Sequence, residues 1–234
     1  MNFETPLKII NLIKRILPDD NKGALLIPFD LKIRDVEYKG YRHLPVNWDV
    51  EVPSKDMLPE DFSRRAVELV NMFRRKTIDL DYEIMLIFDY KTAELIYCFT
   101  GDGYKDDEVY GQVDDEFLEG KNIAVIHNHP TEFGSPPSYE NFQILSLNFE
   151  DYEIISSWEE IWIIESKEVI PENELDVVKQ DIREFYENLD EIAENTDFNK
   201  TTQLNKVYGD FLLQYFKNSH LNVNLIKQEL KYDN

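Results

Sequence analysis

The sequence has almost no cysteine and no long hydrophobic run. Cys98 is the only cysteine, so neither a disulfide within the chain nor a thiolate zinc cluster can form. No apolar stretch approaches the ~18–20 residues of a membrane helix. The first twenty residues lack the layout of a signal peptide, because Lys8, Lys14 and Arg15 interrupt their apolar positions. We therefore expect a cytoplasmic protein with no membrane partner, whose metal sites can use only nitrogen and oxygen ligands.

Positive charge is also scarce. The chain has 25 Lys and Arg residues against 47 Asp and Glu residues, which gives a net charge of −22. Proteins that bind nucleic acids by neutralising phosphates need the opposite balance, so we expect no nucleic-acid partner. Hydrophobic residues make up 42% and aromatic residues 13% of the chain, which is enough for a core and excludes a disordered protein.

The middle of the chain, residues 61–170, alternates between helical and strand patterns. Apolar residues at helical spacing follow Asp61 and Ser63, either of which is a suitable N-cap. Strand-like runs follow at about 83–89, 93–99, 123–126, 152–157 and 159–166, with a helix starting at Ser138 between the third and the fourth. This order predicts an α+β fold in which helices flank a mixed β-sheet.

The two flanks of this middle region carry no motif. Residues 1–60 are expected to form an N-terminal extension of unknown role, with an amphipathic helix over residues 1–22 and short extended segments after it. Residues 171–234 form an acidic helical region, in which apolar stripes over 172–195 and 204–216 predict a helical hairpin. Such stripes are typical of core or partner-packing surfaces, and we assign them no chemistry.

Two of the chain's four histidines stand one residue apart in "AVIHNHPTEFGSPPSYENF", which runs from Ala124 to Phe142. Residues i and i+2 of a strand point to the same face, so His127 and His129 should project together. Pro130 marks the end of the strand, where the active sites of sheet proteins usually open. Zinc accepts imidazole nitrogens, and two histidines plus one further ligand would complete a catalytic site. On its own, the H-x-H pattern is equally that of two loop histidines that bind nothing.

The longer pattern, "HNHP" followed by a polar loop and "PSYEN", resembles the JAB/MPN metalloprotease family, also called JAMM. It is most similar to the RadC-like and toxin-associated prokaryotic and viral branch. The resemblance covers about residues 60–168. It implies an α+β JAB/MPN sandwich, similar to the cytidine deaminase fold, and a zinc-dependent hydrolase of peptide or isopeptide bonds. The implied partner is a protein or peptide, for example a ubiquitin-like tail.

The resemblance also implies residue roles. His127 and His129 would hold zinc, and Asn141 falls on the family's third ligand position, which is normally Asp. Ser138 matches the serine that supports the substrate oxyanion, and Glu83 matches the general acid/base glutamate. From the residues alone, Ser138 is equally a simple helix cap and Glu83 a solvent-facing strand residue.

Asn141 is the main departure from the family pattern. An amide is neutral where Asp is charged, so zinc affinity should be lower. Asn141 can still bind the metal through its oxygen, or Glu140 can replace it, or the domain is a metal-poor relative that serves as a scaffold. The alternative function is therefore a non-catalytic JAB/MPN-fold interaction module with a degenerate metal site.

A zinc deaminase is excluded because it needs a Cys-x-x-Cys pair.

Overall fold

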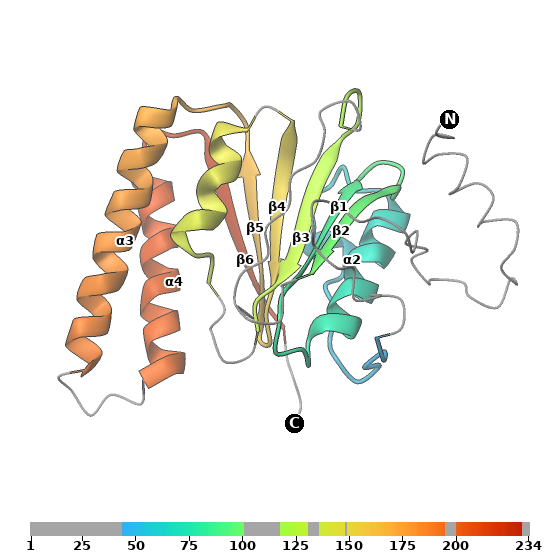
Figure 1. The fold of residues 1–234 in the computed structure, drawn as a ribbon, viewed down its shortest axis with the longest axis horizontal. Helices are drawn as coiled ribbons and strands as arrows, with labels where there is room; N and C mark the ends of the chain where they lie inside the picture. Colours follow the sequence, from blue (N-terminus) through green and yellow to red (C-terminus); the bar gives the residue numbers. More distant parts are fainter. Residues whose placement is uncertain (1–43, 101–117, 131–135, 148, 195–199, 231–234) are drawn as a thin grey trace, which may run out of the picture.

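The computed structural model describes residues 44–100, 118–130, 136–147, 149–194 and 200–230 (Figure 1). Six strands of this part form one mixed sheet in the order β2-β1-β3-β4-β5-β6. The strands are β1 (Ile84–Asp89), β2 (Leu95–Thr100), β3 (Ile123–Asn128), β4 (Glu150–Ser156), β5 (Glu160–Ser166) and β6 (Val223–Glu229). Neighbouring strands are antiparallel except β3 and β4, which are parallel. The predicted α+β class with a mixed sheet is confirmed.

Helix α2 (Arg64–Thr77) covers one face of the sheet, together with the 3-10 turn η3 (Lys55–Met57) before it. Ser63 caps α2 by accepting a hydrogen bond from the backbone N–H of Ala66 at 3.1 Å, as the sequence allows. The apolar stripe of α2 packs on inward-facing residues of the strands, among them Ile126 and Ile154. These two residues alternate with side chains that point to the other face, as strand geometry requires.

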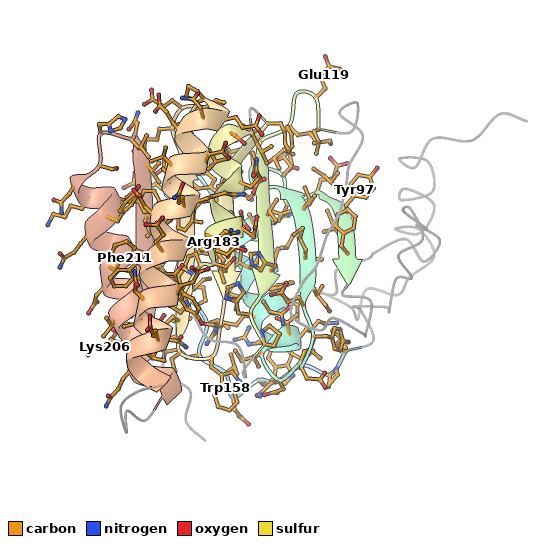
Figure 2. The ribbon with its side chains drawn as sticks, turned by 60° about the vertical axis from the view of Figure 1, so that its left-hand side comes forward. Tyr97, Glu119, Trp158, Arg183, Lys206 and Phe211 are labelled. Carbon is orange, nitrogen blue, oxygen red and sulfur yellow. The ribbon has the colours of Figure 1, made fainter. Side chains whose placement is uncertain are left out.

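The other face carries η5 (Tyr139–Ser146), α3 (Glu172–Glu194) and α4 (Lys200–Asn218), which form the layer at the left of Figure 1. Figure 2 shows Arg183 and Phe211 on this helical layer and Tyr97 at the opposite edge of the sheet, on β2. The predicted hairpin of α3 and α4 is closed by stacked rings of Phe185 and Phe211, whose centroids are 3.7 Å apart. At Gly209 a side chain would meet the Trp162 ring at 3.0 Å, so glycine lets α4 lie directly against β5.

Three sequence expectations differ from the structure or fall outside it. The segment after Ser138 is a 3-10 helix rather than an α-helix. Strand β6 was not expected, and it attaches the C-terminal region to the edge of the same sheet through β5. The helix expected over residues 1–22 lies outside the described residues. No helix in the described ranges is long and apolar enough to cross a membrane.

Candidate metal centre

Strands β1 and β3 bring three potential ligands together at one end of the sheet. Met85 pairs with His127 in the antiparallel register, and continuing that register by two residues places Glu83 opposite His129. The backbone N–H of His129 donates to the Ser156 carbonyl at 3.0 Å, so β3 keeps its pairing with β4 beyond its last assigned residue. Both histidines and Glu83 therefore point to the face that carries η5.

The distances within this group suit one divalent metal ion. Ligand atoms of Glu83, His127 and His129 all lie within 4.8 Å of one another. The two histidine Nε2 atoms are 3.2 Å apart. Two nitrogens bound tetrahedrally at zinc distances of about 2.0–2.1 Å would be about 3.3 Å apart. The geometry of the residues present therefore fits a metal ion, and without one the two Nε2 atoms lie within hydrogen-bond distance of each other.

The protonation of His127 also favours metal binding. The ring is buried, and burial together with the neighbouring His129 lowers the pKa of His127 well below its ordinary value. A neutral imidazole keeps one lone pair, which is the form that ligates metals. At neutral pH the Nε2 atom is thus available to an ion between the two rings.

Asn128, the residue between the two histidines, fixes the backbone around Glu83. Its side-chain oxygen accepts from the N–H of Ile84 at 2.8 Å, and its amide donates to the carbonyl of Tyr82 at 3.0 Å. These two backbone groups flank Glu83, whose side chain is buried. Asn128 points to the opposite sheet face from the histidines, which is why the sequence pattern gave it no role. It holds the start of β1 in register with β3.

Ser138 and Asn141 border the histidines from the first turn of η5. The Asn141 Oδ1 atom accepts from the Ser138 N–H at 2.7 Å and from the Ser138 hydroxyl at 3.1 Å. This leaves its amide nitrogen facing His127, at 3.2 Å from Nε2. The capping interaction read from the sequence is present, and the Asn141 oxygen is engaged in it. Ser138 itself is exposed to solvent.

A carboxyl group that the sequence analysis did not single out lies behind His127. Glu153 on β4 is buried, and its Oε1 atom is 3.3 Å from His127 Nδ1 and 3.4 Å from Asn141 Nδ2. Burial raises the pKa of Glu153 to about 8, although the Asn141 amide acts in the opposite direction. Glu150, on the same strand, is also buried, and burial with the nearby Glu153 raises its pKa well above the ordinary value. The available signal was a charged residue between Tyr152 and Ile154, inside the apolar run of β4.

Glu140 does not reach the histidines in the way that a replacement ligand would require. Its carboxylate pairs with Lys179 of α3 at 3.1 Å, on the exposed side of η5. The segment that leads into η5 is held from α4, where the Tyr208 hydroxyl donates to the Pro137 carbonyl at 2.8 Å. This contact fixes the start of η5 and, through it, the position of Asn141.

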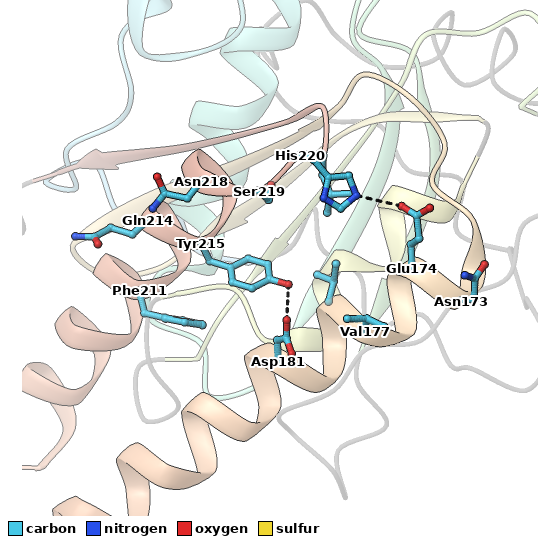
Figure 3. Close-up of a pocket in the computed structure, with 12 residues that line it drawn as sticks. Asn173, Glu174, Val177, Asp181, Phe211, Gln214, Tyr215, Asn218, Ser219 and His220 are labelled. Carbon is cyan, nitrogen blue, oxygen red and sulfur yellow. Dashed lines mark hydrogen bonds and ion pairs between the residues drawn. The ribbon is translucent and has the colours of Figure 1, made fainter.

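A separate concave region lies between α3 and α4 (Figure 3). It has a volume of about 650 Å³, and its walls come only from residues 173–221. Its polar groups pair with each other: the Tyr215 hydroxyl donates to Asp181 at 2.9 Å, and His220 lies 3.7 Å from Glu174. None of the residues around the histidine pair lines it, so it is distinct from the candidate metal centre.

Comparison of the chain with known protein families, with characterised proteins and with solved structures gives no match. The assignment of roles therefore depends on two things. One is the likeness of the histidine segment to the JAB/MPN pattern. The other is the geometry of Glu83, His127 and His129.

Proposed function

We propose that this chain is a zinc-dependent hydrolase of peptide or isopeptide bonds with a JAB/MPN-like fold. The convergence of Glu83, His127 and His129 on one point carries the proposal. These residues come from two different strands and are more than forty positions apart, yet they are the ones that the JAB/MPN pattern assigns to base and ligands. The mixed sheet, with a helix before β1 and the histidines at the end of β3, supports the fold assignment.

Each residue has a defined task in this proposal. His127 and His129 hold the ion through their Nε2 atoms. Zinc, when bound, polarises a carbonyl and lowers the pKa of water at the site. The Glu83 carboxylate accepts a proton from that water and passes it to the nitrogen of the leaving amine. Asn128 keeps Glu83 in place for both transfers by fixing the backbone on either side.

Ser138 and Asn141 complete the rim of the site. The Ser138 hydroxyl is exposed and can turn from Asn141 to donate to an oxyanion of the substrate. Asn141 lies beside His127 with its nitrogen foremost, so its oxygen binds the ion only after the amide turns over and releases Ser138. We assign Asn141 a contribution to the metal site that is weaker than that of the family's Asp.

The second candidate is a non-catalytic interaction module of the same fold. Two observations favour it: the Asn141 oxygen is engaged in capping, and a cavity of about 650 Å³ with mainly apolar walls lies in the helical layer, away from the histidines. In this case the histidines would be a remnant and the surface of α3 and α4 would carry the function.

Metal content separates the two candidates. Full-length protein without a histidine tag is supplied with zinc, desalted and analysed for its elements. We expect about one zinc per chain in the parent, none in His127→Ala, and parental content in His220→Ala, whose side chain is 86% exposed on the distant helical layer. A parent without zinc would refute the hydrolase.

Hydrolysis is then measured on a ubiquitin-like C-terminal tail joined to a fluorescent amine and on a mixed library of quenched peptides. Glu83→Gln should keep its zinc and lose at least about 100-fold in rate, the contribution of a positioned general base. Cleavage that survives in Glu83→Gln would remove Glu83 from the mechanism.

A further inference from the structure

Glu153 is placed where it acts on the outer side of the His127 ring. The ring presents Nε2 to His129 at 3.2 Å and Nδ1 to the Glu153 carboxyl at 3.3 Å. Both groups are buried, with exposed fractions of 2% for His127 and 8% for Glu153. A carboxyl group on one nitrogen and the metal position on the other is the arrangement in which histidine ligands are usually oriented.

The Nδ1 atom of His127 needs such a partner. Among the described residues it makes no hydrogen bond of good geometry, although it is fully buried. A buried polar atom without a partner is costly, and the Glu153 Oε1 atom lies 3.3 Å from it. A small rotation of the ring on metal binding would align Nδ1–H with that oxygen. The same tautomer keeps a lone pair on Nε2, which now faces the Asn141 amide and is the atom that would bind the ion.

Asn141 completes a three-membered contact. Its amide nitrogen lies 3.2 Å from His127 Nε2 and 3.4 Å from Glu153 Oε1, so it is a donor placed between the ring and the carboxyl. An Asp at this position would set a second carboxylate against Glu153, and two carboxylates at this distance disfavour each other. The amide avoids this repulsion and donates to the carboxyl as well.

We propose that Glu153 is a positioning residue of the metal site, which orients His127 through Nδ1 and places a carboxyl group beside the site where residue 141 offers only an amide. The inference rests on the proposed metal site and goes beyond it, because it explains the neutral residue at the third ligand position. In this arrangement the site keeps one carboxyl group near the ion position, displaced from residue 141 to the neighbouring strand β4.

The test measures zinc affinity directly, by competition with a chromophoric chelator at pH 7.5 on the full chain. Glu153→Gln should bind zinc about 10–100-fold more weakly than the parent, the usual effect of removing such an outer partner. The matched control is Glu150→Gln, a carboxyl on the same strand with the same 8% exposure, which forms no ion pair with His127 in the described part of the chain. Its affinity should stay within about threefold of the parent's.

The double variant Asn141→Asp with Glu153→Gln returns the charge to residue 141 and reverses the donor and acceptor of the contact. It should recover zinc affinity to within about threefold of the parent, and the visible spectrum of its Co²⁺ form should keep a tetrahedral intensity. Urea unfolding without metal confirms that each variant is folded. Because Glu153→Leu also removes the acceptor, it should bind zinc at least as weakly as Glu153→Gln.

The outcomes separate this inference from the proposed function. Equal zinc affinities of the parent and Glu153→Gln would overturn the role of Glu153 and leave the hydrolase intact. A double variant as weak as Glu153→Gln would overturn the idea that the carboxyl group can stand at either residue 141 or residue 153. A parent that binds no zinc would overturn the proposed function and this inference together.

Discussion

Two buried polar groups, one associated with each face of the sheet, are satisfied to very different extents. The Arg74 guanidinium on α2 is completely buried and still donates to four oxygen atoms. Its acceptors are the carbonyls of Glu51 (2.8 Å), Ser157 and Trp158 (2.6 Å) and the hydroxyl of Ser156 (3.3 Å). Burial lowers the pKa of Arg74 to about 10, so the group stays charged at neutral pH. It ties α2 to the end of β4.

On the other face, the buried polar group around His127 lacks some of its hydrogen bonds. Its Nδ1 atom lacks a hydrogen bond among the described residues, and one oxygen of the nearby Glu150 does too. Native interiors satisfy nearly all buried polar atoms, and the exceptions cluster where a ligand or a proton is handled. The contrast teaches that Arg74 maintains the structure, whereas the group around His127 leaves buried polar atoms unsatisfied, as functional sites often do. The two are linked, because Arg74 holds Ser156, whose carbonyl fixes His129.

The largest expected effect comes from removing the satisfied group. Arg74→Met should lower the free energy of unfolding by about 3 kcal/mol or more, because it leaves the buried Ser157 carbonyl, the buried Ser156 hydroxyl and two partly buried carbonyls without their donor. His127→Ala should cost less, about 1–2 kcal/mol without metal: the buried ring and its Nε2 contacts to His129 and Asn141 are lost, but Nδ1 has no hydrogen bond to lose. Urea unfolding in a metal chelator measures both. With zinc at 100 times its Kd, only the parent and Arg74→Met should gain the ~2.7 kcal/mol of a bound ligand.

Equal losses in the two variants without metal would break the comparison. So would a gain from zinc in His127→Ala, because the ion would then bind elsewhere. Two results would support the comparison. Arg74→Met should lose much stability relative to the parent whether or not zinc is present. His127→Ala should lose little stability without zinc and more with zinc, because the parent then gains from binding.

A smaller effect is expected at Asn128. Its side chain has hydrogen-bond partners, as Arg74 does, and it belongs to the candidate site, as His127 does. Asn128→Ala releases the backbone around Glu83, so the rate of hydrolysis should fall about 10–100-fold, less than the full contribution of a general base. Zinc affinity should change less than about threefold, because the ligand atoms of both histidines are untouched. Rates and zinc titrations are compared with Thr77→Val, which removes a buried hydroxyl bonded only to its own helix at Phe73.

If Asn128→Ala loses zinc and activity together, its role is to hold the end of β3. If Thr77→Val loses as much activity, the effect is one of general stability. A loss of rate without a loss of zinc affinity would show that Asn128 serves the candidate site, as the histidines do.

Much of the fold could be read from the chain, because its signals are local. The buried runs that became β1 and β3 and the stripe that became α2 each show their period within a few residues. Strand β6 could not be read in this way. Its residues are half-buried at a sheet edge, and Lys227 and Glu229 interrupt its apolar positions. Its pairing with β5 depends on tertiary contacts and not on a local sequence pattern.

The residues of the candidate site divide in the same way, into those that a local pattern predicts and those that depend on tertiary contacts. His127 and His129 follow from the two-residue period of a strand, and Glu83 follows from strand order. Asn128 and Glu153 depend on register between strands that are distant in the sequence. Glu153 was further hidden by composition: in a chain with 47 acidic residues, one more acidic residue in a strand reads as a solvent-facing side chain.

The last expected effect is a pH dependence that the group around His127 should show and Arg74 should not. Burial raises the pKa of Glu153 from its ordinary value of 4.5 to about 8. Between these values the folded protein retains a proton that the unfolded chain has released, so its stability falls as pH rises. In a metal chelator, the Tm of the parent should therefore decline more steeply from pH 5 to pH 8 than that of Glu153→Gln. Glu150 keeps part of the slope in both proteins, because burial raises its pKa as well. Arg74→Met should retain the parental slope, since Arg74 does not titrate in this range. A parental slope in Glu153→Gln would mean that Glu153 is already charged in the folded protein.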